Sequence, residues 1–83
     1  LHSKIFVQIF KMGMDYQEEI RYISTRIKEL RKERMLTVQE LAYRCDMERS
    51  NLSRIEAGRT NLTIRTMCII CNALNVNLRD VIR

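Results

Sequence analysis

The stretch from Thr37 to Gly58, TVQELAYRCDMERSNLSRIEAG, constrains the fold of this chain more than any other. Thr37 is a favourable helix N-cap with Glu40 three residues later, and Gly58 is the residue type that most often ends a helix. Apolar and small residues recur at helical spacing between them, on either side of a short polar break: Leu41, Ala42, Leu52 and Ile55. The pattern predicts two short amphipathic helices, 38–45 and 49–57, joined by a three-residue turn.

The second of these helices has two chemically different faces. Leu52 and Ile55 form an apolar stripe, whereas the opposite face carries Arg49, Ser50, Asn51 and Arg54. Packing fixes the inward side of such a helix and leaves hydrogen-bonding side chains of different lengths on the outward side. Reading base edges in the major groove of DNA requires this arrangement.

The rest of the chain is also expected to be helical. It has 83 residues, no proline and two glycines, which favours helices and limits the chain to one small domain. A first helix from Asp15 to about Arg34, a fourth capped by Thr63 and a final short helix at 78–82 complete the pattern. The buried stripes of the first and fourth helices are expected at Ile20, Ile23, Ile27 and Leu30, and at Ile64, Met67, Ile70, Cys71 and Leu74. The prediction is an all-α bundle of five helices.

Residues 1–14 differ in character from the remainder of the chain. They open with Leu rather than Met and include the apolar run IFVQIF, and a regular helix start begins only at Asp15. We interpret 1–14 as an N-terminal extension from an upstream or cloning-derived segment, and 15–83 as the DNA-binding domain. The alternative is an added strand or helix that packs on the domain or builds a dimer.

Charge and composition narrow the function classes. Fifteen Lys and Arg residues against ten Asp and Glu residues give a net charge of +5, which fits an anionic partner. The longest apolar run is too short to span a bilayer, and three cysteines do not make a disulfide framework, so we expect a reduced, cytoplasmic protein without membrane contact. No combination of nucleophile and base and no phosphate-binding glycine loop is present, so we expect neither an enzyme nor a cofactor.

With these elements placed, residues 23–82 resemble the lambda-repressor/Cro (Xre-type) helix-turn-helix family. The matching segments are RIKELRKER (26–34), LTVQELAYRCDMERSNLSRIEAG (36–58) and LTIRTMCIICNALNVNLRDVI (62–82). The specific signal is a combination of three features. These are Leu-Ala at 41–42, a second leucine eleven residues after Leu41 at Leu52, and Arg-Ile-Glu-x-Gly at 54–58. The resemblance implies a DNA-binding transcriptional regulator that acts as a homodimer on an operator with two half-sites, with 49–57 as the reading helix.

The resemblance also implies roles for individual residues. Base contacts fall on Arg49, Ser50 and Arg54. Phosphate contacts fall on Asn51, on Thr37 and Gln39 at the start of the second helix, and on Arg59 and Asn61 in the loop after the third. In many members the residue at Arg31 forms a partly enclosed ion pair with the glutamate of Arg-Ile-Glu, which is Glu56 here.

Four positions depart from the family pattern. Val38 stands where many members have a phosphate-binding Gln, so Gln39 takes over that contact only if the helix is rotated slightly. Met35 and Asp46 replace glycines, and Asp tolerates positive φ better than most residues. Glu48 replaces the usual Ser or Thr cap of the reading helix, and we expect it to pair with Arg44 or Arg49 or to accept a hydrogen bond from cytosine.

Apolar residues near the end of the chain predict a contact with a second subunit. Cys68 and Ile69 lie off the inward stripe of the fourth helix, and with Val76, Leu78 and Val81 they are expected to form an exposed dimer face. The C-x-x-C of Cys68 and Cys71 is better explained by small apolar side chains than by a metal site, because further ligands are lacking.

Several kinds of short family member fit the chain. A phage-type repressor, a restriction–modification controller protein and an autoregulating antitoxin are all compatible with this length. The main alternative from another class is an antitoxin-type interaction module, whose chief partner is a co-encoded toxin rather than DNA.

Overall fold

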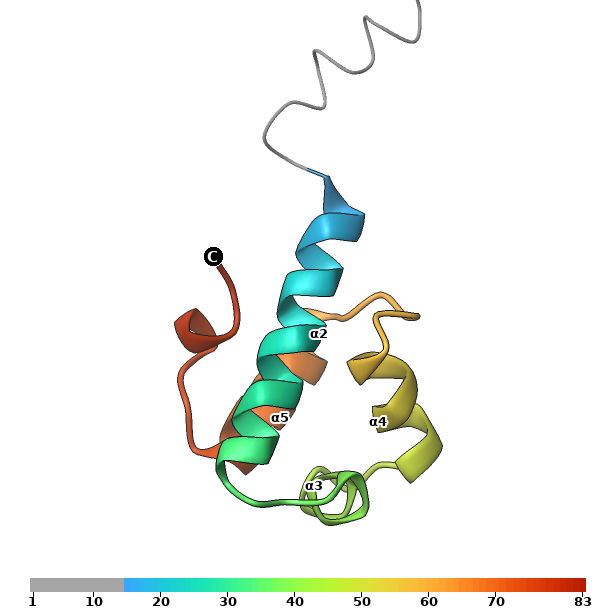
Figure 1. The fold of residues 1–83 in the computed structure, drawn as a ribbon, viewed down its shortest axis with the longest axis vertical. Helices are drawn as coiled ribbons and strands as arrows, with labels where there is room; N and C mark the ends of the chain where they lie inside the picture. Colours follow the sequence, from blue (N-terminus) through green and yellow to red (C-terminus); the bar gives the residue numbers. More distant parts are fainter. Residues whose placement is uncertain (1–14) are drawn as a thin grey trace, which may run out of the picture.

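The computed structural model describes residues 15–83. In this range the chain forms four α-helices and one 3-10 turn, connected by short loops (Figure 1). They are α2 (Tyr16–Glu33), α3 (Val38–Arg44), α4 (Arg49–Glu56), α5 (Ile64–Leu74) and the 3-10 turn η1 (Leu78–Asp80). The interpretations of residues 1–14 as an upstream extension or an added packing element lie outside the described residues.

The predicted N-caps are present, which explains where the helices begin. The side chain of Asp15 accepts a hydrogen bond from the backbone N–H of Gln17 at the start of α2. Thr63 likewise accepts from the N–H of Thr66 at the start of α5, and Asn75 ends α5 in the left-handed conformation. Each cap satisfies a backbone group that the helix itself leaves without a partner.

The expected fifth α-helix is not formed within residues 15–83, where η1 takes its place. Two bonds at η1 join residues three apart: the N–H of Asp80 donates to the carbonyl of Asn77, and that of Val81 donates to the carbonyl of Leu78. The N–H of Ile82 also donates to the carbonyl of Leu78, over the longer distance of 3.2 Å. Val81 is fully buried directly after the turn. Burial of this side chain and the tight i to i−3 bonds hold the chain in a single 3-10 turn, so the five-helix expectation was wrong in this element.

The core lies where the four helices meet. Figure 1 shows α2 along the long axis, with α3 across its C-terminal end, α4 on one side, η1 on the other and α5 behind. The largest fully buried side chains come from all of these segments: Ile27, Leu41, Leu52, Ile70, Leu74 and Val81. Each apolar stripe therefore packs on the others, and α4 is held from both α2 and α3.

Two sequence-based expectations about burial need correction. Ile64 was expected on the buried stripe of the fourth helix, yet 61 % of it is exposed at the first turn of α5. Val81 was expected on an exposed face but is fully buried. No helix within residues 15–83 combines the length and the apolar character that crossing a bilayer would require.

Candidate nucleic-acid interface

Helix α4 has one side fixed in the core and the other open. Leu52 and Ile55 are 0 % and 2 % exposed, so rotation of the helix about its axis would remove them from the core. Arg49, Ser50 and Arg54 are exposed. The structure therefore presents the three predicted base-contacting residues together on the outward face of one helix.

The turn between α3 and α4 is closed by backbone bonds. Asp46 has φ of 54°, in the left-handed region, and the N–H of Met47 donates to the carbonyl of Ala42 over 3.0 Å. Asp is among the residues that tolerate this conformation, and Met47 packs partly into the core. The short turn thus sets the angle at which α4 leaves α3.

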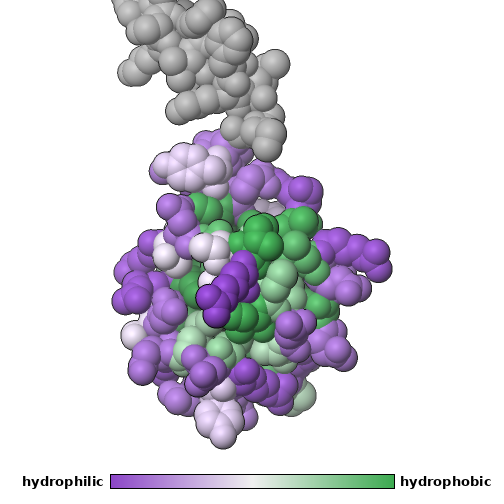
Figure 2. Space-filling view, turned by 180° about the vertical axis from the view of Figure 1, so that it is seen from behind, coloured by the Kyte–Doolittle hydropathy of each residue, from purple (hydrophilic) through white to green (hydrophobic). Residues whose placement is uncertain are grey.

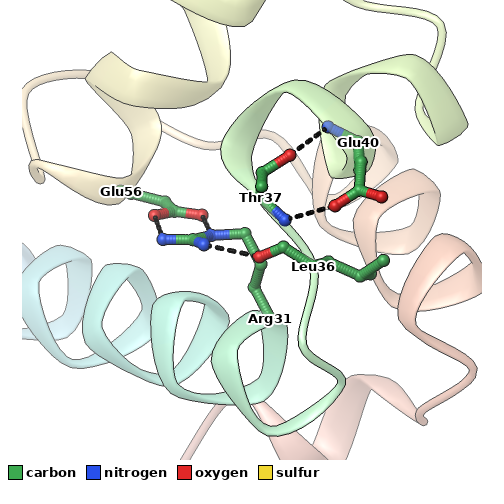
Figure 3. A network of polar contacts seen from close by, with 5 residues as sticks. All are labelled: Arg31, Leu36, Thr37, Glu40 and Glu56. Atoms are coloured by element: carbon green, nitrogen blue, oxygen red, sulfur yellow. Dashed lines mark hydrogen bonds and ion pairs between the residues drawn. The ribbon is translucent and has the colours of Figure 1, made fainter.

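An ion pair joins α4 to α2. The guanidinium of Arg31 donates to both carboxylate oxygens of Glu56, with Nε to Oε2 at 2.7 Å and Nη2 to Oε1 at 3.0 Å. Its Nη1 donates to the backbone carbonyl of Leu36 over 2.7 Å (Figure 3). The pair suggested by the family resemblance is present, and it fixes the C-terminal end of α4 and the loop before α3 to the same arginine.

The start of α3 is organised by a capping box. The hydroxyl of Thr37 accepts from the N–H of Glu40 over 3.1 Å, and the carboxylate of Glu40 accepts from the N–H of Thr37 over 2.8 Å (Figure 3). The hydrogen bond from the backbone N–H of Thr37 is the largest cause that lowers the pKa of the Glu40 carboxyl. Hydrogen bonding with the Thr37 side chain lowers the pKa further. A hydroxyl that accepts one bond still has its own proton to donate, so Thr37 remains competent to bind a phosphate oxygen.

The remaining predicted phosphate ligands lie on α3, on α4 and in the loop after α4. Gln39 is exposed on the first turn of α3, whereas Val38 is half-buried against the core. Arg59 and Asn61 are exposed in the loop after α4, and Asn51 is half-buried on α4 itself. Of Val38 and Gln39, it is therefore the exposed Gln39 that can contact an anion.

Glu48 caps α4 poorly. Its backbone has the extended conformation of an N-cap, but its side chain makes no capping hydrogen bond. Within residues 15–83 no ion pair joins it to Arg44 or Arg49, contrary to one of our expectations. An exposed carboxylate that forms no ion pair with the described residues therefore lies at the N-terminal end of the arginine-bearing face.

The predicted dimer face is only partly exposed in the single chain. Cys68 is exposed, Ile69, Val76 and Leu78 are half-buried, and Val81 is buried, so Val81 is removed from the face. Figure 2, which views the side on which α5 lies, shows apolar surface gathered in the middle of that side. Two further apolar residues are exposed, Ile64 and Ile82, and neither was predicted to be, because periodicity alone places Ile64 in the core and gives no signal for Ile82.

The three cysteines differ in environment. Cys45 and Cys71 are buried, and burial raises the pKa of both thiols, whereas Cys68 is exposed. Cys71 lies on the core stripe of α5, as a small apolar side chain would. The described residues bring no group of three His, Cys, Asp or Glu side chains together at metal-binding distance.

Comparison with known proteins identifies the family. Residues 27–81, more than half of the chain, match the family model described as helix-turn-helix. The immunity repressor protein of Bacillus phage phi105 is 35 % identical over 60 residues, which cover 72 % of this chain and 42 % of the repressor. The chain belongs to the Xre-type helix-turn-helix family of DNA-binding regulators. It spans about two fifths of the length of the phage repressor that it matches.

Two solved structures have a fold similar to that of this chain. The restriction-modification controller protein C.AhdI from Aeromonas hydrophila superposes with a TM-score of 0.74 at 23 % identity, covering 77 % of this chain and 97 % of the controller. The controller protein C.Esp1396I, solved as a tetramer in complex with its natural 35 base-pair operator, has a TM-score of 0.67 at 34 % identity. That match covers 70 % of this chain and 76 % of C.Esp1396I.

Proposed function

We propose that this chain is a sequence-specific regulator of transcription that binds double-stranded DNA as a homodimer, with α4 in the major groove. The observation that supports this most strongly is the pairing of buried Leu52 and Ile55 with exposed Arg49 and Arg54 on opposite sides of α4. A packed helix with a free arginine face is suited to the groove, because the guanidinium fork matches O6 and N7 of guanine.

The proposed division of labour follows from side-chain reach and position. Arg49, Ser50 and Arg54 contact base edges from the open face of α4. Phosphate contacts hold the helix in place from both sides, through Thr37 and Gln39 at the start of α3 and through Asn51, Arg59 and Asn61. Such contacts supply most of the affinity and none of the direct sequence information.

The apolar face around Cys68 and Ile69 is proposed to join two copies of the chain. Exposed Ile64 and Ile82 add to the apolar surface that a single chain leaves in water. A two-fold dimer would place its two α4 helices in successive major grooves, about 34 Å apart along one side of the DNA. The operator would then contain two half-sites.

Relatives favour regulation over the alternative of an antitoxin-type module. The phage relative is named an immunity repressor, and C.Esp1396I was solved on its operator. We therefore propose control of a promoter by operator occupancy, with repression as the mode that the phage relative suggests. Tight binding to a co-encoded protein without any DNA binding would favour the antitoxin-type module instead.

Selection from a random pool of duplexes tests the proposal directly. The protein is expected to enrich sequences with two related half-sites, and gel-shift titration of the enriched duplex should show specific, salt-sensitive binding. Each phosphate contact makes the slope of log K against log salt concentration more negative by about 0.9. Failure to enrich any sequence over the starting pool would overturn the proposed function.

Thiol alkylation tests the homodimer independently of DNA. In the native protein Cys68 should react with iodoacetamide, while buried Cys45 and Cys71 stay unmodified until denaturant is added. If Cys68 lies in the dimer face, its reaction rate should fall as protein concentration rises through the range in which sedimentation detects dimers. A rate that is independent of concentration across that range would exclude Cys68 from the interface.

A further inference from the structure

Helix α2 begins well before the part of the chain that matches the family. The match starts at residue 27, whereas α2 starts at Tyr16, so about three turns of helix precede it. Figure 1 shows the loop after α4 reaching toward this N-terminal half of α2. A Cβ placed on Gly58 would lie 3.7 Å from the Ser24 hydroxyl and 3.9 Å from Cγ of Arg21. The loop therefore lies directly against the early turns of α2.

A surface hollow of about 420 Å³ opens between these two segments. Within the described part of the chain, its lining contains two arginines and several hydrogen-bonding groups but no carboxylate: Tyr16, Gln17, Ile20, Arg21, Gly58, Arg59, Thr60 and Asn61. Two other hollows on the molecule include acidic residues, Glu33 and Asp80 in one and Asp46 and Glu48 in the other. Among residues 15–83, neither Arg21 nor Arg59 forms an ion pair.

The early turns of α2 are held in place from elsewhere in the fold. The guanidinium of Arg83 donates to both carboxylate oxygens of Glu19 over 3.2 Å, and it lies 4.8 Å from the centre of the Tyr22 ring. The carboxylate of Glu19 is thus occupied by Arg83, away from the lining of the hollow. Arg21 and Arg59 are presented on segments that are already ordered, which reduces the entropy lost on binding an anion.

We propose that this hollow binds a phosphate group of the DNA backbone just outside the half-site that α4 contacts. The inference rests on the proposed function and adds the early turns of α2 to the interface. The N–H of Arg59 donates to the carbonyl of Arg54, so the hollow begins where the base-contacting face of α4 ends. Two guanidinium groups with amide and hydroxyl donors, and no opposing carboxylate, are the chemistry that recognises a phosphate.

The test compares one substitution on two lengths of DNA. Two versions of the duplex enriched by selection are used: one ends at the outermost selected base pair, and the other extends by about ten further base pairs, one helical turn, on each side. On the long duplex, Arg21→Gln should weaken binding a few-fold and make the slope of log K against log salt concentration about 0.9 less negative. On the short duplex it should bind as the wild type does.

Arg34→Gln is the matched control, because it removes the same charge from an exposed position at the other end of α2. It should bind the two duplexes with the same ratio of affinities as the wild type. Arg21→Lys, which keeps the charge but loses the planar fork, should retain part of the effect. Urea unfolding curves for all three variants establish that the fold is unchanged.

Four results would overturn the inference, and they are distinguishable. If the wild type enriches no duplex, the proposed function fails and the inference fails with it. If the wild type binds but Arg21→Gln behaves as Arg34→Gln does, only the inference fails. An equal loss on both duplexes would place the contact inside the half-site. Calorimetric titration with inorganic phosphate tests whether the hollow binds a free phosphate instead of the DNA backbone. Saturable phosphate binding that Arg21→Gln abolishes, together with an equal effect of Arg21→Gln on the two duplexes, would assign the hollow to a small phosphate ligand.

Discussion

Arg31 and Glu56 join α2 to α4 by two parallel hydrogen bonds, with only 9 % and 6 % of their side chains exposed. The two charges are mostly removed from water, and the third guanidinium nitrogen, Nη1, donates to the backbone carbonyl of Leu36. A paired, hydrogen-bonded arrangement is the condition under which buried charges are tolerated. The orientation of the arginine-bearing helix thus depends on residues that do not face the solvent.

Glu56→Ala should destabilise the fold by about 3–5 kcal/mol, because the Arg31 charge would remain buried without its partner. The matched control is Glu29→Ala, which breaks an exposed i,i+3 pair with Arg26 and should cost less than about 1 kcal/mol. Urea unfolding followed by circular dichroism measures both. Equal and small effects for the two variants would show that the Arg31–Glu56 pair is not structurally important.

Glu48→Ser should raise both stability and DNA affinity. Glu48 has the backbone conformation of an N-cap without the capping bond, and a serine there should add about 1 kcal/mol to the free energy of unfolding. Loss of the carboxylate should also strengthen phosphate contacts. Glu48→Gln separates the two effects, since it should improve binding without the gain in stability. Weaker, less specific binding by both variants would instead indicate that Glu48 accepts a hydrogen bond from a base.

Met35→Gly should stabilise the protein by up to about 1 kcal/mol. Met35 is 90 % exposed with φ of 57°, a conformation that costs roughly 1–2 kcal/mol for a residue with a Cβ. The greater backbone entropy of glycine in the unfolded chain offsets part of this gain. Met35→Ala, which keeps the Cβ, should leave the thermal midpoint nearly unchanged. A loss of stability with glycine would mean that Met35 packs on something outside residues 15–83.

Local signals account for most of the fold that the sequence predicted. Thr37 and Thr63 are N-caps, and their bonds to residues three further on set the starts of α3 and α5. The apolar stripes predicted the contents of the core, as Ile27, Leu52 and Ile70 show. These features depend on neighbours within one turn of helix, so a pattern along the chain is enough to find them.

Features that depend on tertiary contact were predicted less well. The exposure of Ile64 and the burial of Val81 follow from which elements happen to cover them. The pairing of Arg31 with Glu56 came from the family resemblance, because nothing in the chain's own pattern links two charges on separate helices. The hollow between Arg21 and Arg59 was not foreseen, since it exists only because the loop folds back onto α2.

The central claim is that the open face of α4 contacts bases, and a specificity profile of Arg49→Ala and Arg54→Ala tests it most directly. Selection from a random pool is repeated with each variant and compared with the wild type. Each variant should lose its preference at one base pair in every half-site, corresponding to about 1–3 kcal/mol of discrimination, while other positions keep theirs. Binding that weakens uniformly across all sequences, with the wild-type preference retained at every position, would contradict base contact by these arginines.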